Sequence, residues 1–82
     1  MTDKMLSILR KKIKQTGPKS YHLCGTAPEI LYLSQYLTNL SDYQKMCIKD
    51  LQKKCENGKI QMHNFSFTLN QIKKEFKKNK IV

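Results

Sequence analysis

Two helix-start signals lie close together in the middle of the chain and constrain its fold more than any other feature. Thr26-Ala-Pro-Glu29 and Ser41-Asp-Tyr-Gln44 both match the capping box, in which a Ser or Thr and a Glu or Gln three residues later satisfy free amides of the first helical turn. The sequence therefore predicts a helix that ends near Thr38-Asn39 and another that runs to about Glu56. Only a few residues join them, so the two helices must pack as a corner or hairpin.

Apolar spacing predicts the flanking segments. Residues 3–15 have apolar positions three and four apart with basic residues between them, which indicates a basic amphipathic helix, and Gly17-Pro18 then stops it. Residues 17–25 are expected to be a loop. The apolar positions in 60–76 suit either short alternating strands or a helix, and we favour a brief extended link followed by a helix over about 65–78.

These elements predict an all-α fold, a small bundle of about four short helices. The only β structure that we expect is a short extended segment or hairpin near residues 59–69. The chain is expected to form a single domain over 1–82, with 1–19 containing the basic amphipathic helix and 77–82 a frayed basic tail.

Size and charge limit the classes of function. A chain of 82 residues has little room for a substrate cavity beside a packed core, so we expect no enzyme activity and no catalytic residues. The net charge of +10 is uneven, since residues 1–19 sum to +5 and 45–82 to +7, whereas residues 20–44 sum to −2. The basic ends favour an acidic partner or nucleic acid.

The cysteines do not suggest a cofactor. Cys24, Cys47 and Cys55 are an odd number without a CxxC pair, which favours a reducing, cytoplasmic location over a disulfide framework. Together with His22 and His63 they lack the paired spacing of a zinc site, so we expect no metal. No apolar run is long enough to span a membrane, and the first residues do not resemble a signal peptide.

A DNA-binding function is one hypothesis. The two central helices fit a helix-turn-helix, with 27–37 as the supporting helix, 42–56 as the recognition helix and 59–69 as a wing that turns at His63-Asn64. Lys suits phosphate or guanine, and Gln suits adenine. The residues expected to face the groove are Gln44, Lys45, Lys49, Gln52 and Lys53.

The second half of the chain resembles FlgM-type flagellar anti-sigma factors. The run from Ile48 through Leu51, Gly58 and Ile60 to Met62 has the family's order of helix, glycine, two alternating apolar positions and a further helix, and the resemblance covers about residues 26–76. It implies helices that wrap a sigma factor. The residues that it implies would contact sigma are Ile48, Leu51, Ile60, Met62, Phe67 and Ile72. Cys55 and His63 depart from the family pattern.

The leading functional hypothesis is therefore a small regulator that acts by protein-protein contact, such as an anti-sigma-like inhibitor or a phage-type inhibitor of a host nucleoprotein. Its expected partner is a sigma factor, RNA polymerase or another nucleic-acid-handling protein, engaged by amphipathic helices. The alternative is a DNA-binding regulator with a helix-turn-helix or winged helix at residues 27–69. A membrane-surface role for residues 3–15 ranks third.

Overall fold

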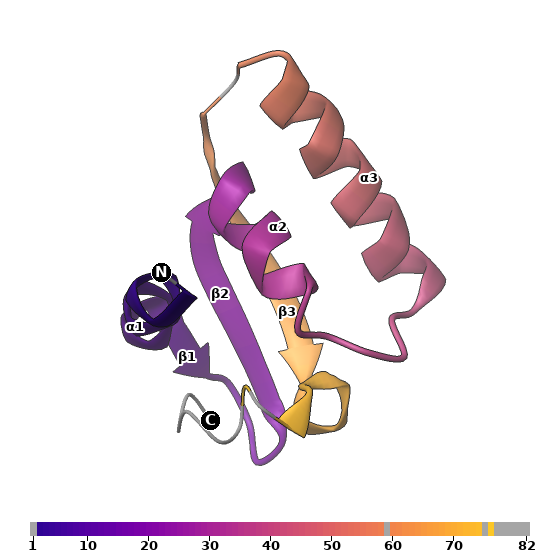
Figure 1. The fold of residues 1–82 in the computed structure, drawn as a ribbon. Helices are drawn as coiled ribbons and strands as arrows, with labels where there is room; N and C mark the ends of the chain where they lie inside the picture. Colours follow the sequence, from indigo (N-terminus) through magenta and orange to yellow (C-terminus); the bar gives the residue numbers. More distant parts are fainter. Residues whose placement is uncertain (1, 59, 75, 77–82) are drawn as a thin grey trace.

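Residues 2–58, 60–74 and 76 are described by the structure, a computed structural model, and they form an antiparallel sheet with helices packed on one face. Figure 1 shows α2 in front of the sheet, with α1 beside one edge strand and α3 beside the other. In chain order the elements are α1 (Thr2–Lys12), β1 (Ile13–Gln15), β2 (Ser20–Thr26), α2 (Ala27–Ser34), α3 (Asp42–Glu56), β3 (Met62–Thr68) and a 3-10 helix (Leu69–Gln71).

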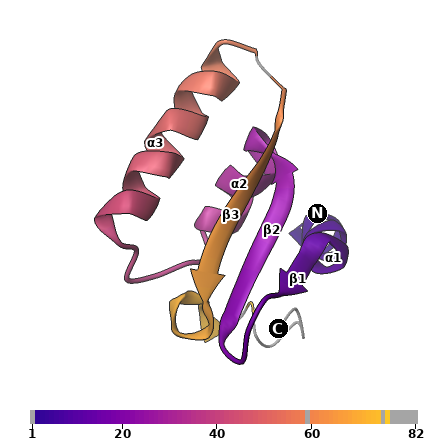
Figure 2. The same ribbon diagram turned by 180° about the vertical axis from the view of Figure 1, so that it is seen from behind.

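The sheet has the strand order β1-β2-β3, so the longest pairing joins β2 to a strand that follows both central helices. Tyr21 pairs with Phe67 and Leu23 with Phe65, and all four side chains point into the helical layer and are buried. Alternate residues of the two strands point to the opposite face, which no helix covers in the reverse view (Figure 2). Among the described residues, the sheet thus has one face packed by helices and one face that no helix covers.

The predicted all-α fold is wrong, because two segments that were expected to be loop and helix are strands. Residues 17–25 contain most of β2, and the start of the expected 65–78 helix belongs to β3. Apart from His63 in β3, the inward positions of both strands are apolar or glycine and the outward positions are mostly polar, a period of two that fits a half-buried sheet and not a helix. His63 and Asn64 lie within β3 and not at the turn of a wing.

The N-terminal helix is also shorter than expected. α1 ends at Lys12, and Ile13–Gln15 continues as β1, which pairs with β2 through Ile13 and Leu23. The Gly17-Pro18 signal therefore marks the turn of a β-hairpin, in which the Thr16 N–H donates to the Ser20 carbonyl at 2.8 Å. The expected tail at 77–82 lies outside the described residues.

Both helix starts that the capping boxes predict are confirmed. The Glu29 carboxylate accepts hydrogen bonds from the Thr26 N–H at 2.9 Å and from the Thr26 hydroxyl at 3.1 Å, and α2 begins at the next residue. At α3 the Ser41 N–H donates to Gln44 Oε1 at 2.8 Å. The Gln44 N–H donates in return to Ser41 Oγ at 3.2 Å. The predicted end of α3 near Glu56 is confirmed as well, and Gly58 follows it with φ of 72°.

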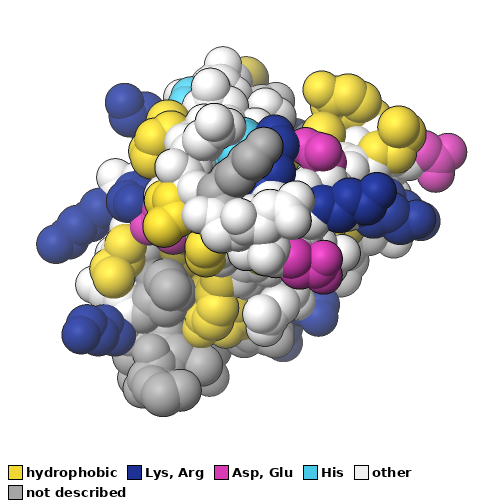
Figure 3. All heavy atoms as spheres, turned by 90° about the horizontal axis from the view of Figure 1, so that it is seen from above, with side chains coloured by type: hydrophobic (Ala, Val, Ile, Leu, Met, Phe, Trp, Pro, Cys, Tyr) yellow, Lys and Arg dark blue, Asp and Glu magenta, His cyan; other side chains and the backbone are white. Residues whose placement is uncertain are grey.

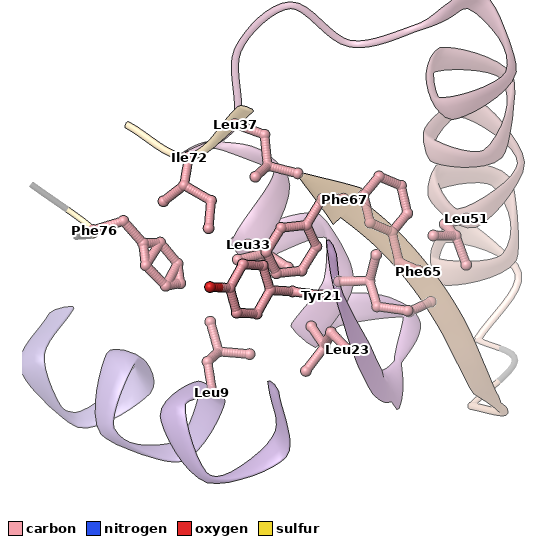
Figure 4. Close-up of a cluster of buried hydrophobic side chains, with 12 residues drawn as sticks. Leu9, Tyr21, Leu23, Leu33, Leu37, Leu51, Phe65, Phe67, Ile72 and Phe76 are labelled. Carbon is pink, nitrogen blue, oxygen red and sulfur yellow. The ribbon is translucent and has the colours of Figure 1, made fainter. Parts of the chain in front are cut away.

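A single hydrophobic core lies between the helices and the inner face of the sheet (Figure 4). Leu9 of α1, Leu23 of β2 and Ile30 of α2 are fully buried, so all three elements contribute to the same core. Tyr36 packs edge-on against Phe76 with ring centroids 5.2 Å apart, which brings the end of the described chain onto the α2 side. The buried core residues are Leu9, Tyr21, Leu23, Ala27, Ile30, Leu33, Leu37, Leu51, Phe65, Phe67, Ile72 and Phe76.

Candidate nucleic-acid interface

The outer face of α3 carries a row of basic side chains. Lys45, Lys49 and Lys53 are all exposed and follow one another at four-residue intervals, so they lie along one side of the helix. We call these three residues the lysine stripe. Within the described part of the chain none of them forms an ion pair, whereas Lys54 pairs with Asp50 at 3.1 Å.

The rotation of α3 about its axis is set by the opposite, apolar side. Leu51 is buried in the core, and Cys47, Ile48 and Cys55 are half-buried against it. These positions recur every three or four residues, so burying them turns the lysine stripe toward solvent. α3 packs mainly on α2 and runs antiparallel to β3 at the side of the sheet (Figures 1 and 2).

Gln44 is not part of the exposed stripe, although the sequence predicted that it faces nucleic acid. Its Nε2 donates to the Ser66 carbonyl at 2.9 Å, which joins the start of α3 to the outer edge of β3. It also bonds the buried side chain of Gln71. Gln52, the other predicted glutamine, is exposed, so four of the five predicted nucleic-acid residues lie on the solvent side of α3.

The six residues that the anti-sigma resemblance implies as sigma contacts do not form one surface. Leu51, Phe67 and Ile72 belong to the hydrophobic core. Ile48 is half-buried and packs against the same core. Only Ile60 and Met62 are exposed, at 76% and 59% of their surface, and both lie at or just before the start of β3.

A hollow of about 660 Å³ lies between the first turn of α3 and the outer edge of β3. Tyr43 borders it from α3, and Asn64, Ser66 and Thr68 border it from β3, with Ser20 at the adjoining end of β2. The other lining residues are Thr16, Tyr21, Ser41, Gln44, Cys47, Phe65, Phe67 and Gln71. Most of the lining side chains carry a hydroxyl or amide group, and none of the described residues that line the hollow is charged.

The sequence did not indicate the hollow. Its signal lies in the alternation of Asn64, Ser66 and Thr68 with Phe65 and Phe67, which assigns the polar residues to one face of a strand. Recognising that alternation still would not have shown that α3 lies beside this strand.

Basic side chains occur on two sides of the molecule. In the view from above, Lys and Arg side chains project from the α1 flank and from the α3 flank, with hydrophobic side chains between and beside them (Figure 3). One cation on the α1 side is neutralised, because Lys12 forms an ion pair with Glu29 at the start of α2. Partial burial alone would raise the pKa of the Glu29 carboxyl, but hydrogen bonds from Lys12 and Thr26 outweigh it and hold the pKa below its ordinary value.

Metal and membrane chemistry receive no support from the described residues. Among them, no three His, Cys, Asp or Glu side chains gather where they could hold a metal ion, and the three cysteines are free. No helix in the described ranges combines the length and the apolar character needed to cross a bilayer.

Comparison of the chain with protein-family models, with curated proteins and with solved structures gives no match.

Proposed function

We propose that this protein is a small nucleic-acid-binding module that contacts phosphates through the lysine stripe of α3. The supporting observation is that Lys45, Lys49 and Lys53 are exposed on one face of a helix whose other face is anchored in the core. Residues four apart on a helix rise by about 6 Å, so the stripe presents a regular series of ammonium groups. A nucleic-acid strand presents an equally regular series of negative charges.

The chemistry of the stripe favours backbone contact over base recognition. Lysine is a flexible point charge, whereas the bidentate recognition of guanine is best made by the planar guanidinium of arginine. α3 contains no arginine. Binding should therefore depend weakly on sequence and strongly on salt. The proposal includes a cytoplasmic location for the protein.

The test is a titration of fluorescently labelled duplex and single-stranded oligonucleotides at about 50 and 200 mM salt. We expect the double variant Lys45→Glu/Lys49→Glu to weaken binding strongly. Replacing each lysine by alanine should reduce the slope of the logarithm of the binding constant against the logarithm of the salt concentration by about one. Lys4→Glu/Lys11→Glu is the matched control, because it changes the net charge equally on exposed positions of α1. Equal losses of affinity in the two double variants would show that binding depends on net charge alone and would contradict a role for the lysine stripe. Absence of binding by the wild type at low salt would refute the proposed function.

A second candidate is regulation by protein contact, with a sigma factor, RNA polymerase or another nucleic-acid-handling protein as partner. It is favoured by the exposure of Ile60 and Met62, two large apolar side chains two residues apart in the chain, just before and at the start of β3. Purified sigma factor is the probe. We expect Ile60→Asp to abolish its binding and Ile8→Asp, on an exposed part of α1, to leave it intact. Unchanged binding by Ile60→Asp/Met62→Asp would contradict this candidate.

A further inference from the structure

We propose that the hollow beside Tyr43 binds an unpaired nucleobase, so that the preferred ligand is single-stranded nucleic acid. The inference rests on the proposed function, because it assumes that phosphates lie on the lysine stripe. The volume of the hollow, about 660 Å³, is within the range of small-molecule sites, about 300–1,000 Å³. Its lining is uncharged in the described residues, which suits a base and not a phosphate.

The edge of β3 supplies free hydrogen-bonding groups to the hollow. The Ser66 carbonyl accepts from Gln44 and the Thr68 N–H donates to Gln71, so the even-numbered residues of β3 present their backbone groups to the outer edge. By the same alternation the N–H and C=O of Asn64 and the N–H of Ser66 face outward. No hydrogen bond to these groups occurs within the described chain, and the exposed Asn64 amide adds a donor and an acceptor.

Tyr43 supplies a flat apolar surface at the rim. It is 76% exposed although it is aromatic, and it makes no ring contact with the described aromatic residues. Bases of single strands stack on such side chains. Lys45 begins the lysine stripe two residues later, about 3 Å further along the helix axis and about 200° around it, so Tyr43 and the stripe lie on different sides of α3. A strand that places a base against Tyr43 must therefore wrap around the first turn of α3 to lay its phosphates on the stripe, which a flexible single strand can do.

A duplex does not satisfy both contacts, because its bases are stacked and paired unless one is flipped out. An extended peptide added to the edge of β3 is the competing occupant. The side chain of Gln44 already binds the Ser66 carbonyl, so an added strand could pair only with the outward groups of Met62 and Asn64 and with the Ser66 N–H. So short a ladder favours a base over an added strand.

The test compares oligo(dT) with a duplex of the same length on the full chain, using the wild type and Tyr43→Ala, Tyr43→Phe and Asn64→Ala. We expect the single strand to bind more tightly than the duplex. Tyr43→Ala should weaken single-strand binding about 5- to 100-fold and leave duplex binding unchanged, whereas Tyr43→Phe should retain most of the affinity. Asn64→Ala should weaken the single strand selectively by a smaller factor.

Met46→Ala is the matched control, since Met46 is exposed on the same helix and does not line the hollow. Its single-strand affinity should equal that of the wild type. If Tyr43→Ala changes neither ligand, or weakens both equally, the base site is refuted. Loss of duplex binding in the lysine variants would still uphold the proposed function in that case. The inference is overturned if a labelled extended peptide competes fully with oligo(dT) for the protein and does not bind the Asn64→Pro variant. The hollow would then be a peptide site.

Discussion

The side-chain amides of Gln44 and Gln71 bond each other twice, with Gln44 Nε2 3.0 Å from Gln71 Oε1 and Gln71 Nε2 2.6 Å from Gln44 Oε1. Gln71 is buried, and it also accepts the Thr68 N–H and donates to the Asn39 carbonyl. This one side chain therefore joins the segment before α3, α3 itself and the end of β3. Buried amides of this kind are costly to leave unpaired.

We expect Gln71→Ala to lower the free energy of unfolding by about 2–3 kcal/mol, because it leaves the Thr68 N–H and the Gln44 amide without their partner. Urea denaturation measures the change. Gln52→Ala, at an exposed position of α3, is the control and should stay within about 0.5 kcal/mol. If Gln44→Ala and Gln71→Ala prove additive in a double-mutant cycle, the two amides are not coupled as described.

The Glu29 carboxylate should make stability depend on acid pH. Its pKa is lowered in the folded chain, so the unfolded chain binds the proton more readily. The stabilisation is therefore present above the unfolded pKa and is lost as the pH falls through the folded pKa. We expect the stability difference between the wild type and Glu29→Gln to shrink as the pH falls from about 6 to about 3, measured by thermal unfolding. A difference that is constant with pH would contradict this linkage.

Neighbouring positions on α1 should respond very differently to truncation. Leu9 is fully buried in the core, so Leu9→Ala should cost about 2–5 kcal/mol of unfolding free energy. Ile8→Ala, one residue earlier and exposed, should cost less than about 1 kcal/mol. Chemical denaturation of the two variants gives the comparison. Similar values for both would mean that α1 does not pack on the sheet in solution.

The turn after α3 should require glycine for conformational reasons alone. Gly58 has φ of 72°, and a Cβ atom built there meets nothing within 4 Å. Gly58→Ala should therefore cost about 1 kcal/mol through backbone strain and without a clash. Gly17→Ala is the comparison, because Gly17 has no positive φ and its nearest contact would be an ordinary 3.5 Å. A neutral Gly58→Ala would show that the turn adopts another conformation.

The sequence predicts the local parts of this fold well, because their determinants are a few residues apart. Thr26 with Glu29 and Ser41 with Gln44 specify two helix starts within single turns, and Gly58 specifies a stop. The strands depend on partners far along the chain. Nothing near Tyr21 indicates that it will lie opposite Phe67, so local signals predict a loop where β2 lies.

The same difference applies to the two sites. Lys45, Lys49 and Lys53 lie on one helix, so the spacing alone aligns them, and burial of Leu51 turns them outward. The hollow needs Tyr43 beside Asn64, which only the completed sheet provides. Gln44 lies on the helix as expected, but a buried partner from beyond β3 draws its side chain inward.

The β2–β3 pairing also determines how the chain must assemble. Thr26 pairs with Met62 and Ser20 with Thr68, so every rung of this ladder closes a loop that contains both central helices. A helical bundle can form from local contacts, whereas this core has high contact order and should fold more slowly. Since helices form faster than such distant strand pairs, we expect α2 and α3 to form before β3 pairs with β2.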